Sequence, residues 1–194
     1  MHHIYHTEGI ILGSRNFKEA GKYYHIFTRD LGLVYAEAEG VRKITSKLRY
    51  VLQDYSYIKL DLIQRKNIWR ITTASKTNEL EAINQEFFKL KILANLSKLL
   101  IRLLPEQEKN TNLFQDFLNG LFVLNNNSDR QELQNIEIIM VLRALYNLGY
   151  IDGEESFSAL IKSPFEDSNI LSGIAKNKKE VLLEINKALR ETQL

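Results

Sequence analysis

Residues 54–63 read DYSYIKLDLI, and this alternating stretch decides the fold of the first part of the chain. Successive side chains of a β-strand point to opposite faces, so residues two apart share a face. One face of the predicted strand carries Ser56, Ile58, Leu60 and Leu62. The other face carries Tyr55, Tyr57, Lys59 and Asp61. The stretch therefore predicts a strand with one apolar face for a core and one polar, aromatic face directed outward.

Similar strand patterns lie on both sides of this stretch. The predicted strands cover residues 3–14, 22–29, 33–39, 54–63 and 68–72. A turn at Leu31-Gly32 precedes the strict alternation of the third strand, and a polar turn at 64–67 precedes the last. Five short strands within about 75 residues, with no long helix between them, favour a small closed barrel over an open sheet.

The apolar period changes from two residues to a helical spacing after residue 78. A first helical series ends at Pro105, because proline cannot continue a helix. A second helix is predicted to end in the asparagines at 125–127. A third begins at Asp129, with a glutamate at capping-box spacing, and stops at Gly149.

A polar, poorly patterned stretch then precedes a last predicted helix, which carries Leu182, Ile185 and Leu189. The rear part of the chain is therefore expected to be a helical bundle. We predict an α+β protein with two domains: a five-stranded barrel at residues 1–78 and an all-helical domain at residues 79–194.

The net charge of +2 conceals an asymmetry between the two predicted domains. Residues 1–78 carry 13 Lys and Arg against 7 Asp and Glu, or +6, whereas residues 79–194 carry 13 against 17, or −4. A basic domain joined to a mildly acidic one suggests a polyanionic partner for the first. The chain lacks cysteine and shows neither a signal peptide nor a membrane span, so we expect a cytoplasmic protein.

Positive charge gathers in residues 40–50, GVRKITSKLRY, between the third and fourth predicted strands. The cations are Arg42, Lys43, Lys47 and Arg49. Cations on a connection can reach phosphates, although a charge run is often only a solvated loop. Tyr50, Tyr55 and Tyr57 are close by, and exposed rings beside cations suit unpaired bases, on which they stack. The sequence leaves open the alternative that these tyrosines lie in a core beneath the helical domain.

Arg65 and Lys66 form a second basic pair at the tip of the hairpin between the last two strands, where a solvated turn is the simpler interpretation. Arg70 is predicted to lie on the face opposite Trp69. The Trp69 ring is better suited to a core or a domain interface than to stacking on bases.

No arrangement of residues indicates catalysis or a metal. His2, His3 and His6 lie close together, but no fourth ligand of suitable type is spaced near them. Glu37 and Glu39 share a strand face, as the metal-binding carboxylates of a nuclease do, without a third acid to complete a site. Gly-rich phosphate loops, nucleophile elbows and zinc-protease motifs are missing. We predict a protein that is not an enzyme and needs no cofactor.

An ordered series of motifs runs through the first part of the chain. It consists of Thr7–Arg15 (TEGIILGSR), Glu19-Ala20, Phe27–Gly32 (FTRDLG), Ala38–Lys43 (AEGVRK) and Lys47–Gln53 (KLRYVLQ). In order and spacing these motifs resemble the RecO family of bacterial DNA repair proteins, the recombination mediators. The resemblance covers about residues 5–75 well. It continues weakly at Leu142–Tyr150 (LRALYNLGY), which is similar to the family's helix ending in Leu-Gly.

The resemblance implies an oligonucleotide-binding (OB) barrel followed by an all-helical domain. It also implies binding of single- and double-stranded DNA, annealing of complementary strands, and action on DNA coated by single-stranded DNA-binding protein. With RecR, such proteins help to load the RecA recombinase in gap repair, in the bacterial cytoplasm at the nucleoid. The basic positions that match the family pattern are Arg15, Arg29, Arg42, Lys43, Lys47 and Arg49. The predicted DNA-binding set adds Tyr50, Arg65 and Lys66.

Some positions depart from the family pattern. Glu39 stands where the family usually has lysine, and Asp54 where it usually has proline, so we expect weaker DNA binding. Many members carry a four-cysteine zinc module after the Leu-Gly helix, and a chain without cysteine is expected to bind no zinc there. The C-terminal region is short for the family, which leaves open whether it holds the acidic tail of single-stranded DNA-binding protein.

Other functions also fit these residues. The barrel could serve as a protein-interaction scaffold, with the acidic helical half making the main contacts. An RNA-binding barrel is a second alternative, and a metal-dependent nuclease is the enzyme alternative.

Overall fold

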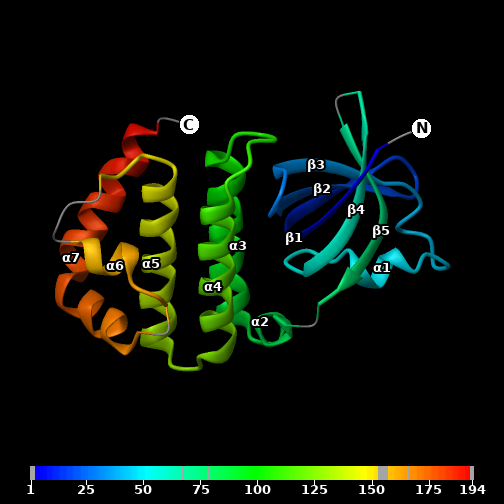
Figure 1. The fold of residues 1–194 in the computed structure, drawn as a ribbon. Coiled ribbons are helices and arrows are strands. Elements are labelled where there is room, and N and C mark those ends of the chain that lie inside the picture. Colours follow the sequence, from blue (N-terminus) through cyan, green and yellow to red (C-terminus); the bar gives the residue numbers. More distant parts are fainter. Residues whose placement is uncertain (1–2, 67, 78, 153–156, 166, 193–194) are drawn as a thin grey trace.

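The computed structural model describes residues 3–66, 68–77, 79–152, 157–165 and 167–192, with a barrel at one end and helices at the other (Figure 1). His2, the turn residue Asn67 and the predicted domain boundary at residue 78 lie outside the described residues.

The barrel is the closed five-stranded type predicted from the sequence. Its strands are β1 (Ile4–Phe17), β2 (Gly21–Thr28), β3 (Gly32–Ala38), β4 (Tyr57–Arg65) and β5 (Ile68–Lys76). They close in the order β1-β2-β3-β5-β4, and the neighbours are antiparallel except for the parallel pair β3 and β5. β1, β4 and β5 extend beyond their predicted ends, and β4 begins at Tyr57 instead of residue 54, because Tyr55 has a left-handed φ of +70°. Bulges between Ile11 and Gly13 and between Asp61 and Leu62 break the two-residue period on which the prediction depends.

The apolar face predicted for residues 54–63 is confirmed, whereas on the other face Tyr57 is buried against the helices instead of directed into solvent. Ile58, Leu60 and Leu62 are buried inside the barrel, and Trp69 lies in the same core with 4% of its surface exposed. Arg70, on the opposite face of β5, pairs with Glu39. The barrel interior is therefore filled by one face of each alternating strand.

One short helix lies within the barrel sequence, and the other helices follow the barrel along the chain. They are α1 (Leu48–Val51), within the barrel, and then α2 (Glu81–Gln85), α3 (Phe87–Leu103), α4 (Thr111–Asn126), α5 (Arg130–Asn147), α6 (Ser158–Lys162) and α7 (Ser168–Glu191). The predicted stops at Pro105, at the asparagines and at Gly149 agree with the observed ends, and Gly149 has the left-handed φ of +77° common after a helix. None of the described helices is long and apolar enough to cross a membrane.

Only half of the predicted capping box of α5 forms. The Asp129 carboxylate accepts a hydrogen bond from the backbone N–H of Glu132 at 2.8 Å, as expected for an N-cap. The Glu132 carboxylate, however, accepts from the side-chain amide of Asn127 at 2.6 Å. Asn127 also accepts from the backbone N–H of Asp129, and thus replaces the return bond that Glu132 would make.

The buried face of α7 differs from the predicted one. Val181, Ile185 and Ala188 are buried, whereas 37% of the Leu182 surface is exposed and Leu189 is only partly buried. Both sets have helical spacing, so the spacing alone could not distinguish them.

The barrel and the helices share a core. Ile10, Leu12, Phe27 and Leu33, on the outer face of the barrel, belong to the same buried cluster as the apolar faces of α3, α4 and α5. The Phe27 and Phe114 rings meet edge to face with centroids 5.3 Å apart. The backbone joins here too, because Leu33 pairs with Glu106 in a parallel bridge, and the Gln107 N–H donates to the Leu33 carbonyl at 2.9 Å.

Candidate nucleic-acid interface

Residues 40–56, here called the basic loop, connect β3 to β4 at one end of the barrel (Figure 1). Gly40 begins the loop with a φ of +67°. The Arg42 N–H then donates to the Ala20 carbonyl at 2.9 Å, which fastens the loop to the turn between β1 and β2. Further along, Leu48 and Val51 of α1 pack against the barrel core. Backbone and apolar contacts thus hold the loop against the barrel.

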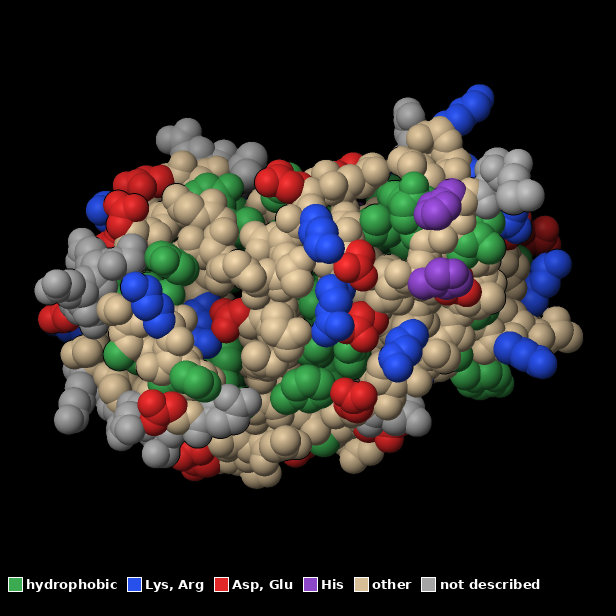
Figure 2. All heavy atoms as spheres, viewed as in Figure 1, with side chains coloured by type: hydrophobic (Ala, Val, Ile, Leu, Met, Phe, Trp, Pro, Cys, Tyr) green, Lys and Arg blue, Asp and Glu red, His purple; other side chains and the backbone are tan. Residues whose placement is uncertain are grey.

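The structure brings five of the predicted site residues together on the basic loop. They are Arg42, Lys43, Lys47, Arg49 and Tyr50, all of them exposed. Within the described part of the chain, none of the four cations forms an ion pair. Figure 2 shows Lys and Arg side chains on the barrel margin that faces away from the helices. Cations without acidic partners can neutralise phosphates at little cost.

A hollow of about 520 Å³ opens between β2 and the basic loop. Its lining residues are Lys22, Tyr24, Val41, Arg42, Arg49, Leu52, Gln53 and Asp54. Three of these are cations and one is a carboxylate, so the potential inside this basic hollow favours an anion. Burial, and then the charge of Asp54, raises the pKa of Tyr24, whose hydroxyl therefore stays protonated and donates to the Leu52 carbonyl at 3.3 Å.

Lys22 belongs to the basic hollow, although the sequence analysis did not select it. Lys22 is the second residue of β2, and its ammonium donates to the Ser14 hydroxyl at 3.1 Å. Alone in the sequence, Lys22 looks like an ordinary strand-end lysine. Only the contact between the β1–β2 turn and the basic loop places it beside Arg42.

Glu39, expected to weaken the positive field, is paired with Arg70. Its carboxylate lies 3.1 Å from an Arg70 guanidinium nitrogen. Both side chains are about a third or more exposed, so the pair is screened by solvent. Part of the Glu39 charge is thus compensated by Arg70 on the neighbouring strand.

Arg15 lies apart from the basic loop, on the outer face of β1. Its guanidinium is 5.2 Å from the Tyr35 ring centroid and 5.5 Å from that of Tyr23, and its Nε donates to the Tyr35 hydroxyl at 2.7 Å. Burial, and then the charge of Arg15, lowers the pKa of the nearby His25, which favours its neutral form. Arg15 therefore belongs to an aromatic surface.

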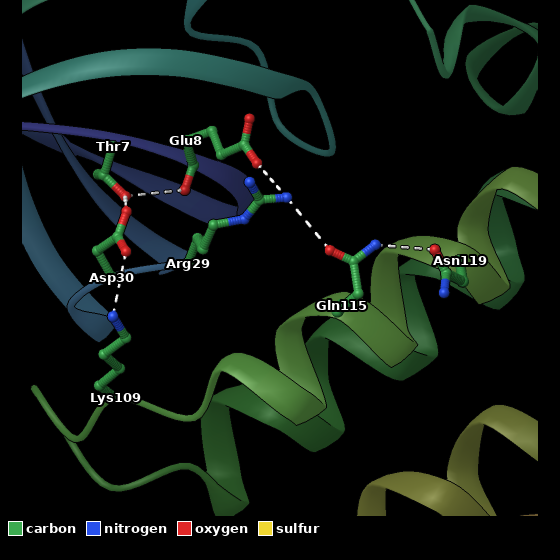
Figure 3. A network of polar contacts seen from close by, with 7 residues as sticks. All are labelled: Thr7, Glu8, Arg29, Asp30, Lys109, Gln115 and Asn119. Atoms are coloured by element: carbon green, nitrogen blue, oxygen red, sulfur yellow. Dashed lines mark hydrogen bonds and ion pairs between the residues drawn. The ribbon is translucent and has the colours of Figure 1, made fainter. Parts of the chain in front are cut away.

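Arg29 lies at the junction of the barrel and α4 (Figure 3). Its guanidinium is 2.5 Å from a Glu8 carboxylate oxygen, donates to the Gln115 side-chain oxygen at 3.2 Å, and lies 5.7 Å from the Phe114 ring centroid. These contacts occupy Arg29 in joining the two regions. Its assignment as a DNA contact stays a prediction.

Arg65 and Lys66 are exposed at the tip of the β4–β5 hairpin. Figure 1 shows this tip and α1 at different ends of the barrel, and a hollow of about 300 Å³ lined by Arg65 and by Leu48 of the basic loop lies between them. A role for the hairpin in binding DNA stays a prediction.

The three tyrosines weighed as stacking platforms have different environments. Tyr50 is 65% exposed, whereas Tyr57 is buried against the helices with its ring 6.5 Å from that of Phe122. Tyr55 is partly buried and packs against the same core. Burial also raises the pKa of Tyr57, with a further contribution from its hydrogen bond to Glu8. The core alternative thus holds for Tyr57, and Tyr50 is the ring available to a ligand.

A second hollow, of about 510 Å³, lies beside Arg29. Its ionisable lining residues are His6, Glu8, Arg29, Asp30, Lys59 and Asp61. Hydrogen bonds from Thr73 and then His6 lower the pKa of Asp61, which keeps that carboxylate charged. Carboxylates thus outnumber the Lys and Arg side chains here, and this hollow suits a polyanion poorly.

No group of three or more His, Cys, Asp or Glu side chains is placed to hold a metal ion among the described residues. His3 and His6 fall within them, while His2 does not.

Comparisons with known proteins bear on both regions. A model of the N-terminal domain of recombination protein O matches residues 1–80, and a model of its C-terminal domain matches residues 84–151. A protein of Clostridium perfringens named DNA repair protein RecO is 26% identical over 183 residues, which is 93% of this chain and 74% of that protein.

Two further proteins of the same name match over shorter stretches. The one from Heliobacterium modesticaldum is 30% identical over 121 residues, 62% of this chain and 44% of its own length. The one from Mycoplasma mycoides is 29% identical over 124 residues, 63% of this chain and 50% of its own length. The matches thus span about half the length of these two relatives. The two domain models together cover the barrel and the helices as far as the end of α5, and the chain therefore belongs to the RecO family.

Proposed function

We propose that the chain binds single- and double-stranded DNA through the basic loop and acts as a DNA recombination mediator. One observation carries the proposal: Arg42, Lys43, Lys47 and Arg49 are exposed together on the basic loop, without ion pairs among the described residues, and Arg42 and Arg49 line the basic hollow. The phosphate backbone supplies most of the affinity in binding of this kind, because cations that contact phosphates release condensed counterions.

Annealing follows from the same charge. Two complementary strands repel each other, and cations that contact their phosphates reduce this repulsion while leaving base edges free to pair. Membership of the RecO family supports the wider role: action on DNA coated by single-stranded DNA-binding protein and, together with RecR, assistance in loading RecA. These partners and the annealing step are part of the proposal.

The salt dependence of binding tests the basic loop. If four cations contact phosphates, a plot of log K against log salt has a slope of about −3 for a single strand. Changing Arg42, Lys43, Lys47 and Arg49 to Gln should remove most of that slope and abolish annealing. The measurement is fluorescence anisotropy with a labelled oligonucleotide at several salt concentrations.

A matched control carries the same loss of charge elsewhere. Its four changes, all at exposed positions of the helices, are Lys98, Arg102, Lys179 and Arg190 to Gln. This variant should keep the wild-type slope, because the lost charges are far from the basic loop. Equal effects of the two variants would show that only net charge matters, and unchanged binding by the first would refute the site.

A further inference from the structure

The helices cover only part of the outer face of β1, β2 and β3. Ile10, Phe27 and Leu33 lie beneath the helices, fully or almost fully buried. Beyond them, the same strand faces carry partly exposed rings. We call these rings, Phe17, Tyr23, Tyr35 and His25, the aromatic column. The sequence analysis did not select any of them.

The rings of the column stack across the strands. The centroid distances are 4.0 Å from Phe17 to Tyr23, 4.9 Å from Tyr23 to Tyr35 and 5.1 Å from Tyr35 to His25. The angles between neighbouring ring planes are only 31° to 42°. Rings lying flat on a sheet would be farther apart, so these rings stand out from it with their faces toward one another. A stacked column can be extended at its ends, where one ring face has no aromatic neighbour.

Phe17 ends this column beside the β1–β2 turn. Gly21 lies opposite Phe17 in the sheet, and a Cβ added at Gly21 would be 3.4 Å from a carbon of the Phe17 ring. The absence of a side chain at Gly21 lets the ring lean onto Tyr23. The ammonium of Lys18 lies 4.8 Å from the Phe17 centroid, and a cation over an exposed ring is held only weakly.

The basic hollow lies on the other side of the same turn. Lys22 follows Gly21 directly and lines that hollow, and Ala20 accepts the hydrogen bond that fastens Arg42. The turn that carries Phe17 and Lys18 on one face of the sheet therefore carries Lys22, and holds Arg42 by its backbone, on the side of the basic hollow. A ring face next to a group of cations matches a base next to its own phosphates.

We propose that Phe17 seats one unpaired nucleobase of a bound single strand, with the neighbouring phosphates held by the lysines of the turn and by the basic hollow. The inference rests on the DNA-binding function proposed above and names the ligand of this part of the barrel. A duplex keeps its bases stacked within itself, so it cannot use the ring. Stacking on Phe17 thus strengthens the binding of single-stranded DNA and not that of double-stranded DNA.

The variant Phe17→Leu tests the seat, because leucine keeps the apolar bulk and removes the flat face. We expect about tenfold weaker binding of an oligothymidylate and a change of less than twofold for a fully paired hairpin. The salt slope should not change, since no phosphate contact is lost. The matched control is Phe87→Leu, at a phenylalanine on α3 that is 82% exposed, and it should bind both DNAs normally.

Unchanged oligothymidylate binding by Phe17→Leu, or equal losses for single strand and hairpin, would overturn the seat. If the variant fails to fold, photocrosslinking of the wild-type chain to an oligonucleotide containing 5-iodouracil gives a second measurement. Peptide mass spectrometry should then find the crosslink at Phe17, and crosslinks confined to other residues would refute the proposal. A wild-type chain that binds neither DNA would instead contradict the proposed function itself.

Discussion

Gly32 is the residue at which one added carbon would collide with the backbone of the helical region. Its φ is +67°, and a Cβ built there would lie 2.0 Å from the Glu108 carbonyl oxygen. The turn that the sequence predicts at Leu31-Gly32 explains only the left-handed conformation of Gly32. The tight approach of residue 108 comes from the docking of the segment after α3.

Gly32→Ala should therefore be much more harmful than another glycine change with the same backbone strain. We expect it to lower the free energy of unfolding by about 3 kcal/mol, as the sum of left-handed strain and overpacking. Gly40 has the same φ of +67° and only the Lys43 side chain near its missing Cβ, so Gly40→Ala should cost about 1 kcal/mol. Urea denaturation measures both, and equal losses would mean that the segment at Glu108 simply moves aside.

The site residues that could be predicted are those whose environment is local. Arg42, Lys43 and Lys47 belong to one charged connection, which the sequence displays directly. Arg29 could not be assigned to the domain junction, because its partner Gln115 is 86 positions away. The stacking of Phe17 on Tyr23 could not be predicted, because stacking across strands depends on the register of β1 and β2.

Arg143 joins three helices at the end of α5. Its side chain is buried, and it forms an ion pair with Asp116 of α4 at 2.8 Å while its Nε donates to the Leu160 carbonyl of α6, also at 2.8 Å. The guanidinium carbon lies 4.0 Å from the Phe165 ring centroid. Burial raises the pKa of Asp116, and the charge of Arg143 opposes this shift. The family-like helix at residues 142–150 thus contains a structural arginine.

Arg143→Lys should destabilise the helical region even though the charge is kept. An ammonium cannot reproduce the planar fork that donates to a carboxylate and to two carbonyls. We expect a loss of about 2–3 kcal/mol in the free energy of unfolding. This loss is small for a broken buried ion pair, because 24% of the Asp116 side chain is exposed. Circular dichroism at 222 nm during urea denaturation measures it. Arg102→Lys, at an exposed position of α3, is the control and should cost less than about 0.5 kcal/mol.

Helix ends were predictable where a residue acts on its own backbone. Pro105, Asn127 and Gly149 each stop a helix by local means, and the structure agrees with all three. The buried face of α7 was not predictable, because Val181 and Leu182 both begin an apolar series and only the neighbouring helix selects one of them. The β-bulges could not be predicted from the sequence either, since a bulge changes the pairing of a strand and not its composition.

The shared core should make the barrel and the helices unfold as one unit. Trp69, the single tryptophan, lies inside the barrel and reports on it by fluorescence, while circular dichroism at 222 nm reports on the helices. We expect the two thermal unfolding curves to coincide, because Phe27 and Leu33 of the barrel belong to the helical core. Two separate transitions in the wild-type chain would contradict this.

Phe114→Ala should lower both curves together. Phe114 is fully buried between the regions, and its removal costs about 3–5 kcal/mol, which is roughly 10 °C in the unfolding midpoint of a chain of this size. Phe87→Ala, on the exposed side of α3, should leave both curves in place. A shift in the helical signal alone would show that the barrel is stable without its neighbour.

The parallel bridge between Leu33 and Glu106 also fixes geometry across the whole chain. It lies at the junction, with α1 on one side and α7 at the far end of the other (Figure 1). Two domains joined only by a flexible linker sample many separations, and their ligands are averaged over them. Here backbone pairing and a continuous core replace such a linker. The basic loop and the last helix are therefore held at one distance and one angle.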